Sequence, residues 1–208
     1  MAATSVSNHE PLLLAITGAS GAVYAVRLLE VLVEGGQNVH LLISPSGAAV
    51  IQQELDRNVS VDRFELTQLL PAAIAAKAKD LVQYHHHADF LSPLASGSFL
   101  TGGMVVCPCS GSTLSGIAHA SSTNLIQRAA DVHLKERRKL ILVPRETPLS
   151  LIQIDNLRRA AEAGAVILPA SPGWYHGVRT PQDLVDFVVA RILDQLAISH
   201  RLMRRWGE

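Results

Sequence analysis

Short apolar runs alternate with amphipathic stretches along most of this chain. Continuous apolar runs, the pattern of strands buried on both faces, cover residues 11–17, 39–43, 104–108, 139–143 and 164–169. Apolar side chains recur at helical spacing in residues 22–34 and 181–197, and residues 148–163 fit a further helix. Strands that alternate with helices predict a mostly parallel sheet with helices on both faces.

Smaller elements are expected between these runs. They are a helix that begins near Pro45, a helix at 71–76, a short strand at 81–84 and a Ser/Gly/Pro-rich loop at 92–103. With no internal repeat and no linker, the predicted fold is one three-layer, doubly wound α/β domain over residues 11–208, after a flexible polar tail of residues 1–10. Ligands of such folds bind at the carboxyl ends of the strands.

Composition narrows the class of protein. Of 208 residues, 48% are hydrophobic, 4% are aromatic, and Lys+Arg and Asp+Glu number 18 each. A chain without net charge and with few aromatic rings lacks the excess of basic residues and the stacking rings that are typical of nucleic-acid-binding proteins. No apolar run has the length of a membrane span, and the polar start has no secretory signal, so we expect a cytoplasmic protein.

The candidate binding loops follow the predicted strands. Thr17-Gly-Ala-Ser-Gly21 is a small-residue turn that lets backbone amides approach a phosphate or a flat ring, although an ordinary tight turn fits equally well. Ser44 ends the second predicted strand, where a dinucleotide-binding fold would have an acidic residue that binds the ribose, and its absence disfavours NAD as a ligand. Hydroxyls and amides at a further helix start come from Ser110, Gly111, Ser112 and Thr113.

Cations flank one predicted strand. Arg128 and Lys135 precede the run 139–143, and Arg145 and Glu146 follow it. Guanidinium and ammonium groups are the usual partners of phosphate, so this concentration predicts a bound anion. Arg191, on an otherwise apolar helix stretch, either pairs locally or reaches an anion.

Two further features are interpreted as structural. Cys107 and Cys109 stand too close in sequence to bridge readily, and we expect buried thiols rather than nucleophiles. His85, His86 and His87 cannot all point to one side of a regular element, and we expect them in a solvated loop rather than at a metal. No metal site is predicted.

Together these motifs resemble the UbiX-type flavin prenyltransferases. The resemblance rests on TGASG at 17–21, SGS at 96–98, PCS at 108–110, RAADVHLKERR at 128–138, RETP at 145–148, GAVILP at 164–169 and the terminal Arg205-Trp206. It implies a flavodoxin-like fold, FMN as ligand, and a homo-oligomer, expected to be a dodecamer. It also implies metal-independent transfer of a dimethylallyl group from dimethylallyl phosphate to N5 and C6 of reduced FMN. Prenylated FMN would then pass to a UbiD-type decarboxylase.

The resemblance also implies roles for individual residues. Ser20, Glu54, Glu146 and Trp206 would take part in catalysis. FMN would be held by Gly18, Ala19, Ser20, Ser44, Ser110, Gly111, Ser112, Thr113 and Arg145, and the substrate phosphate by Arg128, Lys135, Tyr175 and Arg191. We expect Arg191 to point to the carboxyl ends of the strands and to share an anion with Tyr175.

The chain departs from the family pattern in places. Ser44-Pro-Ser-Gly47 stands where relatives often have Ser-Lys-Ala-Ala, and Val178 replaces a frequent Pro. Two other functions stay open: FMN-dependent decarboxylation of an aromatic acid, and a non-catalytic FMN carrier. The choice between monophosphate and diphosphate donor also stays open.

Overall fold

The computed structural model describes residues 10–205 and residue 207. Its centre is a six-stranded sheet with the order β3-β2-β1-β4-β5-β6, and every neighbouring pair is parallel. The strands are β1 (Leu12–Ile16), β2 (Val39–Ile43), β3 (Val82–His86), β4 (Gly103–Cys109), β5 (Leu140–Pro144) and β6 (Val166–Ile167). The predicted doubly wound α/β fold with a parallel sheet is confirmed.

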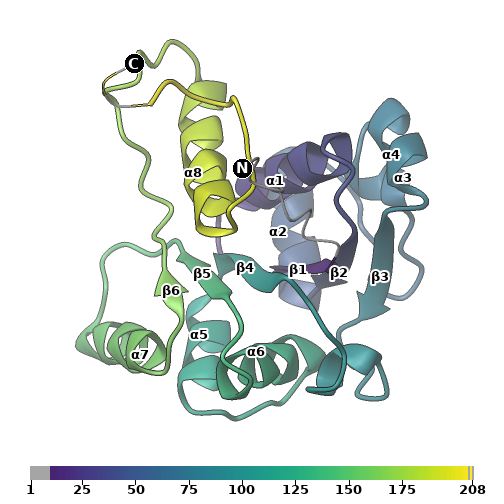
Figure 1. Cartoon of the computed structure of the whole chain (residues 1–208), viewed down its shortest axis with the longest axis vertical. Helices are drawn as coiled ribbons and strands as arrows, with labels where there is room; N and C mark the ends of the chain where they lie inside the picture. Colours follow the sequence, from purple (N-terminus) through teal and green to yellow (C-terminus); the bar gives the residue numbers. More distant parts are fainter. Residues whose placement is uncertain (1–9, 206, 208) are drawn as a thin grey trace, which may run out of the picture.

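Helices cover both faces of the sheet (Figure 1). They are α1 (Ala22–Glu34), α2 (Pro45–Leu55), α3 (Leu66–Leu69), α4 (Ala72–Ala78), the 3-10 turn η1 (Pro93–Ala95), α5 (Gly111–Ala118), α6 (Leu125–Lys135), α7 (Leu151–Glu162) and α8 (Pro181–Gln195). One apolar core joins α1, α4 and α8 to the sheet, and a second joins α5, α6 and α7 to the opposite face. None of the helices within the described residues combines the length and apolar character that a membrane crossing needs.

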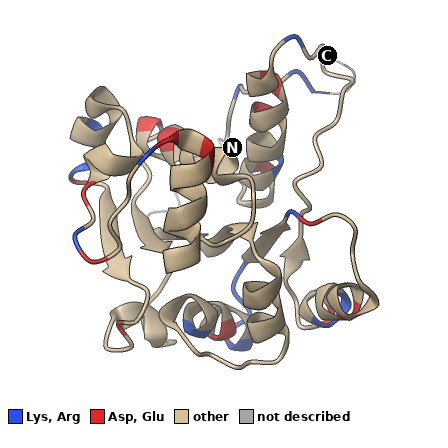
Figure 2. Ribbon diagram, turned by 180° about the vertical axis from the view of Figure 1, so that it is seen from behind, with Lys and Arg blue, Asp and Glu red and all other residues tan. Residues whose placement is uncertain are grey.

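Strand alternation explains the two cores. Leu12, Leu14 and Ile16 of β1 enter the first core, whereas Leu13 and Ala15 enter the second. All five residues are buried, as a central parallel strand requires. The strands contain no Asp, Glu, Lys or Arg, and Figure 2 shows the charged residues on helices and connecting segments instead.

Several element boundaries differ from the prediction. The helix expected at 148–163 begins only at Leu151, because Ser150 caps it and exchanges a reciprocal pair of hydrogen bonds with Gln153. The last strand shrinks to Val166–Ile167. The expected solvated histidine loop is wrong, since His85 lies in β3 and is buried. The prediction for residues 1–9 lies outside the described part of the chain.

Candidate active site at the carboxyl edge of the sheet

Three helix N-termini meet where the chain reverses its order in the sheet. β1 lies between β2 and β4, and α1, α2 and α5 begin directly after these three strands. Such a switch point is the usual ligand crevice of open α/β sheets. Ser44 caps α2 by accepting a hydrogen bond from the Gly47 amide at 3.0 Å, and Ser110 caps α5 by accepting one from the Thr113 amide at 3.3 Å.

A buried threonine ties two of these loops together. The Thr17 hydroxyl donates to the Pro108 carbonyl at 2.7 Å and accepts from the Ser110 amide at 2.8 Å. Thr17 is 1% exposed, so these bonds form out of water. They fix the end of β1 against the start of α5, and so set the spacing of the two loops.

The N-terminus of α1 is capped from another helix. Gly21, at its N-cap position, has no side chain that could accept a hydrogen bond, and the Glu54 carboxylate of α2 accepts instead. The two Glu54 carboxylate oxygens lie 3.0 and 2.9 Å from the Gly21 amide nitrogen, and one also accepts from the Ala22 amide at 2.9 Å. Partial burial opposes ionisation, but hydrogen bonds from the Ser20 hydroxyl and the two amides outweigh it and lower the Glu54 pKa.

Arg145 closes the loop from the side of β5. Its Nε–H donates to the Ser20 carbonyl at 3.2 Å, across 125 residues of sequence. Its positive charge is one of the causes that lower the pKa of Glu54. Ser20, Glu54 and Arg145, predicted from separate parts of the sequence, are therefore brought together.

Gly18 and Gly47 allow the loop after β1 and the start of α2 to approach each other closely. A methyl group on Gly18 would stand 2.5 Å from the Ser46 side chain, and one on Gly47 would stand 2.6 Å from the Ile16 carbonyl oxygen. Both distances are shorter than any real contact of this kind, so only glycine fits. The Ser44 and Ser46 hydroxyls, 3.1 Å apart, lie beside the Gly18 turn as a result.

The α5 start presents a group of hydroxyls. The Ser110 hydroxyl lies 3.2 Å from that of Ser112 and 3.0 Å from that of Thr113. We define the carboxyl-edge cluster as the residues of the three loops and helix starts together with Glu54 and Arg145, which reach the first loop: Gly18, Ala19, Ser20, Ser44, Ser46, Glu54, Ser110, Gly111, Ser112, Thr113 and Arg145. It contains every predicted flavin-binding residue.

Tyr24 is a member of this region that sequence reasoning missed. A methyl group on Gly21 would stand 2.9 Å from Cδ2 of Tyr24 and 4.0 Å from Cγ of Arg145. Burial, and after it the nearby Cys107, raises the pKa of the half-buried Tyr24 phenol. Tyr24 is the third residue of α1, and nothing in the local sequence distinguishes it from an ordinary helix residue, so the sequence did not indicate its place at the site.

Arg128 and Lys135 do not join the cluster within this chain. Arg128 donates to the Ala95 carbonyl at 3.1 Å and pairs with Asp131 at 2.7 Å, and Lys135 pairs with Glu136. Lys135 ends α6 just before β5 begins, whereas Arg145 follows the end of β5, and five strand residues span about 16 Å. The expectation of one cationic site around this strand is therefore wrong for a single chain. Glu146, adjacent to Arg145, is exposed.

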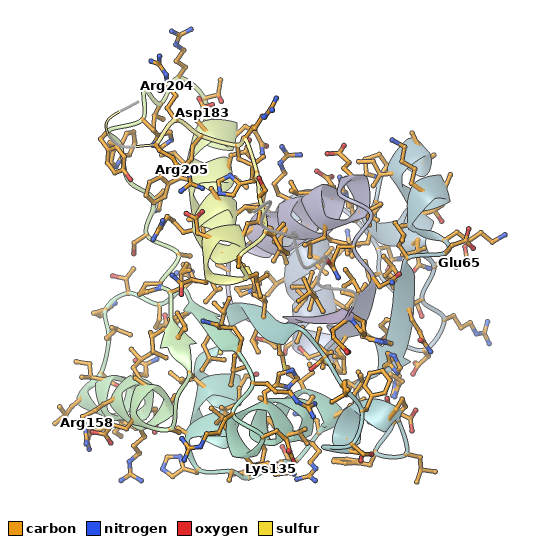
Figure 3. All side chains as sticks on the ribbon, viewed as in Figure 1. Glu65, Lys135, Arg158, Asp183, Arg204 and Arg205 are labelled. Carbon is orange, nitrogen blue, oxygen red and sulfur yellow. The ribbon has the colours of Figure 1, made fainter. Side chains whose placement is uncertain are left out.

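Arg191 forms its ion pair within its own helix. Its guanidinium pairs with Asp194 at 2.6 Å. The end of α8 approaches the start of β4, where a methyl group on Gly103 would stand 3.3 Å from Leu196. Arg191 stands five residues before Leu196 on this helix. Figure 3 shows Arg205, beside α8, at the opposite side of the molecule from Lys135.

Tyr175 lies on the surface against α8. It is 53% exposed, and its ring meets Phe187 edge to face, with centroids 5.7 Å apart. Phe187 and Arg191 are one helical turn apart, so Tyr175 and Arg191 share one side of α8. Trp206 lies outside the described residues.

Both cysteines are buried free thiols. Cys107 enters one core and Cys109 the other, because the register of β4 shifts between Val106 and Cys109. Burial raises the pKa of Cys109 to about 12 and that of Cys107 higher still. The structural interpretation of these thiols is confirmed. No three metal-binding side chains converge within residues 10–205 and 207.

The family assignment rests on comparison with known proteins. The flavoprotein family profile matches residues 2–193. The flavin prenyltransferase UbiX of Pseudomonas aeruginosa is 46% identical over 203 residues, which cover 98% of this chain and 97% of that protein. The chain belongs to the flavoprotein family, among its UbiX-type members.

Two solved structures support the same assignment. A UbiX protein in complex with FMN and dimethylallyl pyrophosphate has 37% sequence identity and a TM-score of 0.83, and the match covers 96% of this chain and 98% of that one. A dodecameric FMN-dependent UbiX-like decarboxylase from Escherichia coli has 38% identity and a TM-score of 0.81, with 95% and 100% covered. The resemblance stated from sequence is confirmed.

Proposed function

We propose that this protein is a flavin prenyltransferase. It transfers a dimethylallyl group from dimethylallyl phosphate to N5 and C6 of reduced FMN and so makes prenylated FMN. The observation that carries this proposal is the match, over nearly its whole length, to relatives that are flavin prenyltransferases. The related structure that holds FMN with dimethylallyl pyrophosphate supports FMN and a dimethylallyl donor as the ligands.

The carboxyl-edge cluster fits FMN in its donors. Glu54 already occupies the amides that open α1, which leaves the starts of α2 and α5 for an anion. The hydroxyls and amides of Ser44 and of Ser110, Gly111, Ser112 and Thr113 would hold the flavin's phosphate tail or its ring carbonyls. Gly18, Ala19 and Ser20 would lie against the ring, and Arg145 would hold it from the side of β5. When bound, reduced FMN supplies the nucleophilic N5 and C6 positions.

The reaction also needs cations and a base. Breaking the allylic C–O bond leaves an allyl cation and a phosphate anion, and fixed positive groups stabilise that phosphate without a metal. Arg128, Lys135, Tyr175 and Arg191 would serve this purpose. Glu146 would accept the proton that is lost when the second bond forms. Trp206 would offer an aromatic face to the allyl cation.

The positions of these cations support an oligomeric site. Lys135 precedes β5, whereas the cluster lies at the carboxyl ends of the strands, and the ion pairs of Lys135 and Arg191 are with Glu136 and Asp194 rather than with the cluster. A dodecameric relative exists at 38% identity. We infer that this chain forms a homo-oligomer, a dodecamer, in which other copies present these residues to each cluster. In the cytoplasm the product would then pass to a UbiD-type decarboxylase.

The direct test is anaerobic incubation of the purified protein with reduced FMN and dimethylallyl phosphate. Mass spectrometry should detect a flavin heavier by one dimethylallyl group. Parallel incubation with the diphosphate would decide which donor is used. Recovery of unmodified FMN alone after long incubation with both donors would refute the proposal.

Two variants of the experiment separate the alternative functions. A decarboxylase would release CO2 from an aromatic acid without any partner enzyme, which a prenyltransferase does not do. A carrier would keep its support of a UbiD-type decarboxylase when Glu146 is changed to Gln. A prenyltransferase should lose most of that support, because Glu146→Gln removes the proposed base.

A further inference from the structure

The ring of Tyr24 fills the space that Gly21 leaves open. Gly21 has a φ of 110°, a left-handed conformation that glycine adopts without strain. A methyl group there would stand 2.9 and 3.1 Å from two ring carbons of Tyr24. The ring therefore lies directly against the turn that carries Ser20, and it packs on the apolar core at its other side.

Arg145 meets the same turn from β5. The same methyl group on Gly21 would stand 4.0 Å from Cγ of Arg145, so the aliphatic part of the Arg145 side chain passes close to Gly21. Beyond it, Nε–H donates to the Ser20 carbonyl at 3.2 Å. Besides the hydrogen bonds to Glu54, the turn is thus held by a ring at Gly21 and by the Arg145 hydrogen bond at Ser20, and these two restraints are neighbours.

We propose that Tyr24 is a positioning residue of this site: its ring holds the 18–21 turn and Arg145 in the arrangement that receives the flavin. This inference rests on the proposed function, because the flavin is the ligand. A long side chain such as Arg145 loses rotamer freedom when it is ordered, and a rigid ring beside it lowers that cost on binding.

The phenol itself is neutral in this environment. Burial is the largest cause that raises the pKa of Tyr24, and nearby Cys107 and Glu54 add to it, whereas Arg145 opposes it. Tyr24 therefore adds no negative charge beside Arg145 that would compete with an anionic ligand. The ring, rather than the hydroxyl, carries the role.

A double-mutant cycle on FMN affinity tests the inference. Flavin fluorescence titration of the full-length protein should give a dissociation constant about tenfold higher for Tyr24→Ala and about tenfold or more higher for Arg145→Ala. The double variant should bind more tightly than the product of the two single losses predicts, because part of the effect of Tyr24 passes through Arg145. Tyr24→Phe keeps the ring and should restore affinity to within about twofold of wild type.

Two further variants serve as controls. Val23→Ala, beside Tyr24 in α1, removes apolar volume packed on the first core and should leave the FMN dissociation constant near the wild-type value, and Tyr24→Leu serves if Tyr24→Ala does not fold. Additive losses for Tyr24→Ala and Arg145→Ala, or Tyr24→Phe as weak as Tyr24→Ala, would overturn the inference. If wild type binds no FMN at all, the proposed function itself fails, so the two failures are distinct.

Discussion

Thr17 and Ser110 are joined by a buried hydrogen bond, although 93 residues separate them in the chain. The Ser110 amide donates to the Thr17 hydroxyl oxygen at 2.8 Å, and the hydroxyl proton goes to the Pro108 carbonyl at 2.7 Å. One side chain therefore satisfies a donor and an acceptor on another loop. Because Ser110 also caps α5, this contact connects the loop after β1 to the start of α5.

Thr17→Val should destabilise the fold by about 1–3 kcal/mol, because it keeps the shape of the side chain and leaves the buried Ser110 amide without its acceptor. Thr17→Ser keeps the hydroxyl and should cost less, since it removes only a methyl group. Urea unfolding of both variants gives the two free energies. Equal losses would show that packing, and not the hydrogen bond, is what Thr17 contributes.

Glu54→Ala should lower the free energy of unfolding by about 0.5–2 kcal/mol, the range for loss of a helix N-cap. It should also weaken FMN binding, because the 18–21 turn loses its anchor. Glu54→Gln, which keeps an acceptor but no charge, should fall between wild type and Glu54→Ala. Chemical denaturation with flavin titration measures both effects.

The Glu54 contribution should depend on pH in one direction only. Because its folded pKa is lowered from 4.5, the carboxylate stabilises the fold at neutral pH, and this stabilisation is lost as the pH falls through the folded pKa. The stability difference between wild type and Glu54→Gln should therefore shrink in acid. A constant difference down to acid pH would contradict the assigned cap.

His40 should make the fold sensitive to mild acid. Its Nδ1 lies 2.8 Å from Nε2 of His85, whose Nδ1 lies 2.9 Å from the Ser92 hydroxyl. Burial, and then the neighbouring His85, lowers the His40 pKa from 6.5 to about 4. The unfolded chain binds the proton first as the pH falls, so stability is lost between pH 6.5 and about 4, by up to about 3 kcal/mol.

The measurement is the free energy of unfolding at a series of pH values. His40→Gln cannot take up this proton, so its curve should be flatter than the wild-type curve below about pH 6.5. His119→Gln, at an exposed histidine that ends α5, should follow wild type. Parallel curves for wild type and His40→Gln would rule out this imidazole as the acid-sensitive group.

The sequence predicted local features well. The run 22–34 shows helical spacing, and α1 covers the same residues. The buried strands were predicted from continuous apolar runs. The place of the candidate site was predicted from the rule that ligands bind at the carboxyl ends of the strands. These signals depend only on neighbours in the chain.

Features that depend on register or helix direction could not be predicted in this way. His85 faces inward because β3 pairs with β2 in a register that sets it opposite Leu42, beside His40. Arg191 pairs with Asp194 one turn further along α8, a local contact that the sequence left as one of two readings. Glu54 caps α1 from 33 residues away, and no local pattern marks that pairing.

Arg191→Ala should weaken use of dimethylallyl phosphate much more than binding of FMN. Loss of one charge-assisted contact should raise the apparent substrate constant about ten- to a hundredfold. The FMN dissociation constant should change little, because the carboxyl-edge cluster does not contain Arg191. Arg158→Ala, at an exposed pair with Glu162 on α7, is the matched control and should alter neither value. Equal loss of both affinities would remove Arg191 from the phosphate site.

Mixed oligomers should reveal whether Arg191 acts on the cluster of another copy. Assayed with FMN and dimethylallyl phosphate below the wild-type constants, Arg145→Ala and Arg191→Ala should each keep only a small fraction of the activity. If each site combines Arg145 of one copy with Arg191 of another, random co-assembly of equal amounts should restore about one quarter of wild-type activity. A site built within one chain would gain nothing, because every chain would carry one defect. Co-expression with two affinity tags, followed by the prenylation assay on doubly purified oligomers, distinguishes these outcomes.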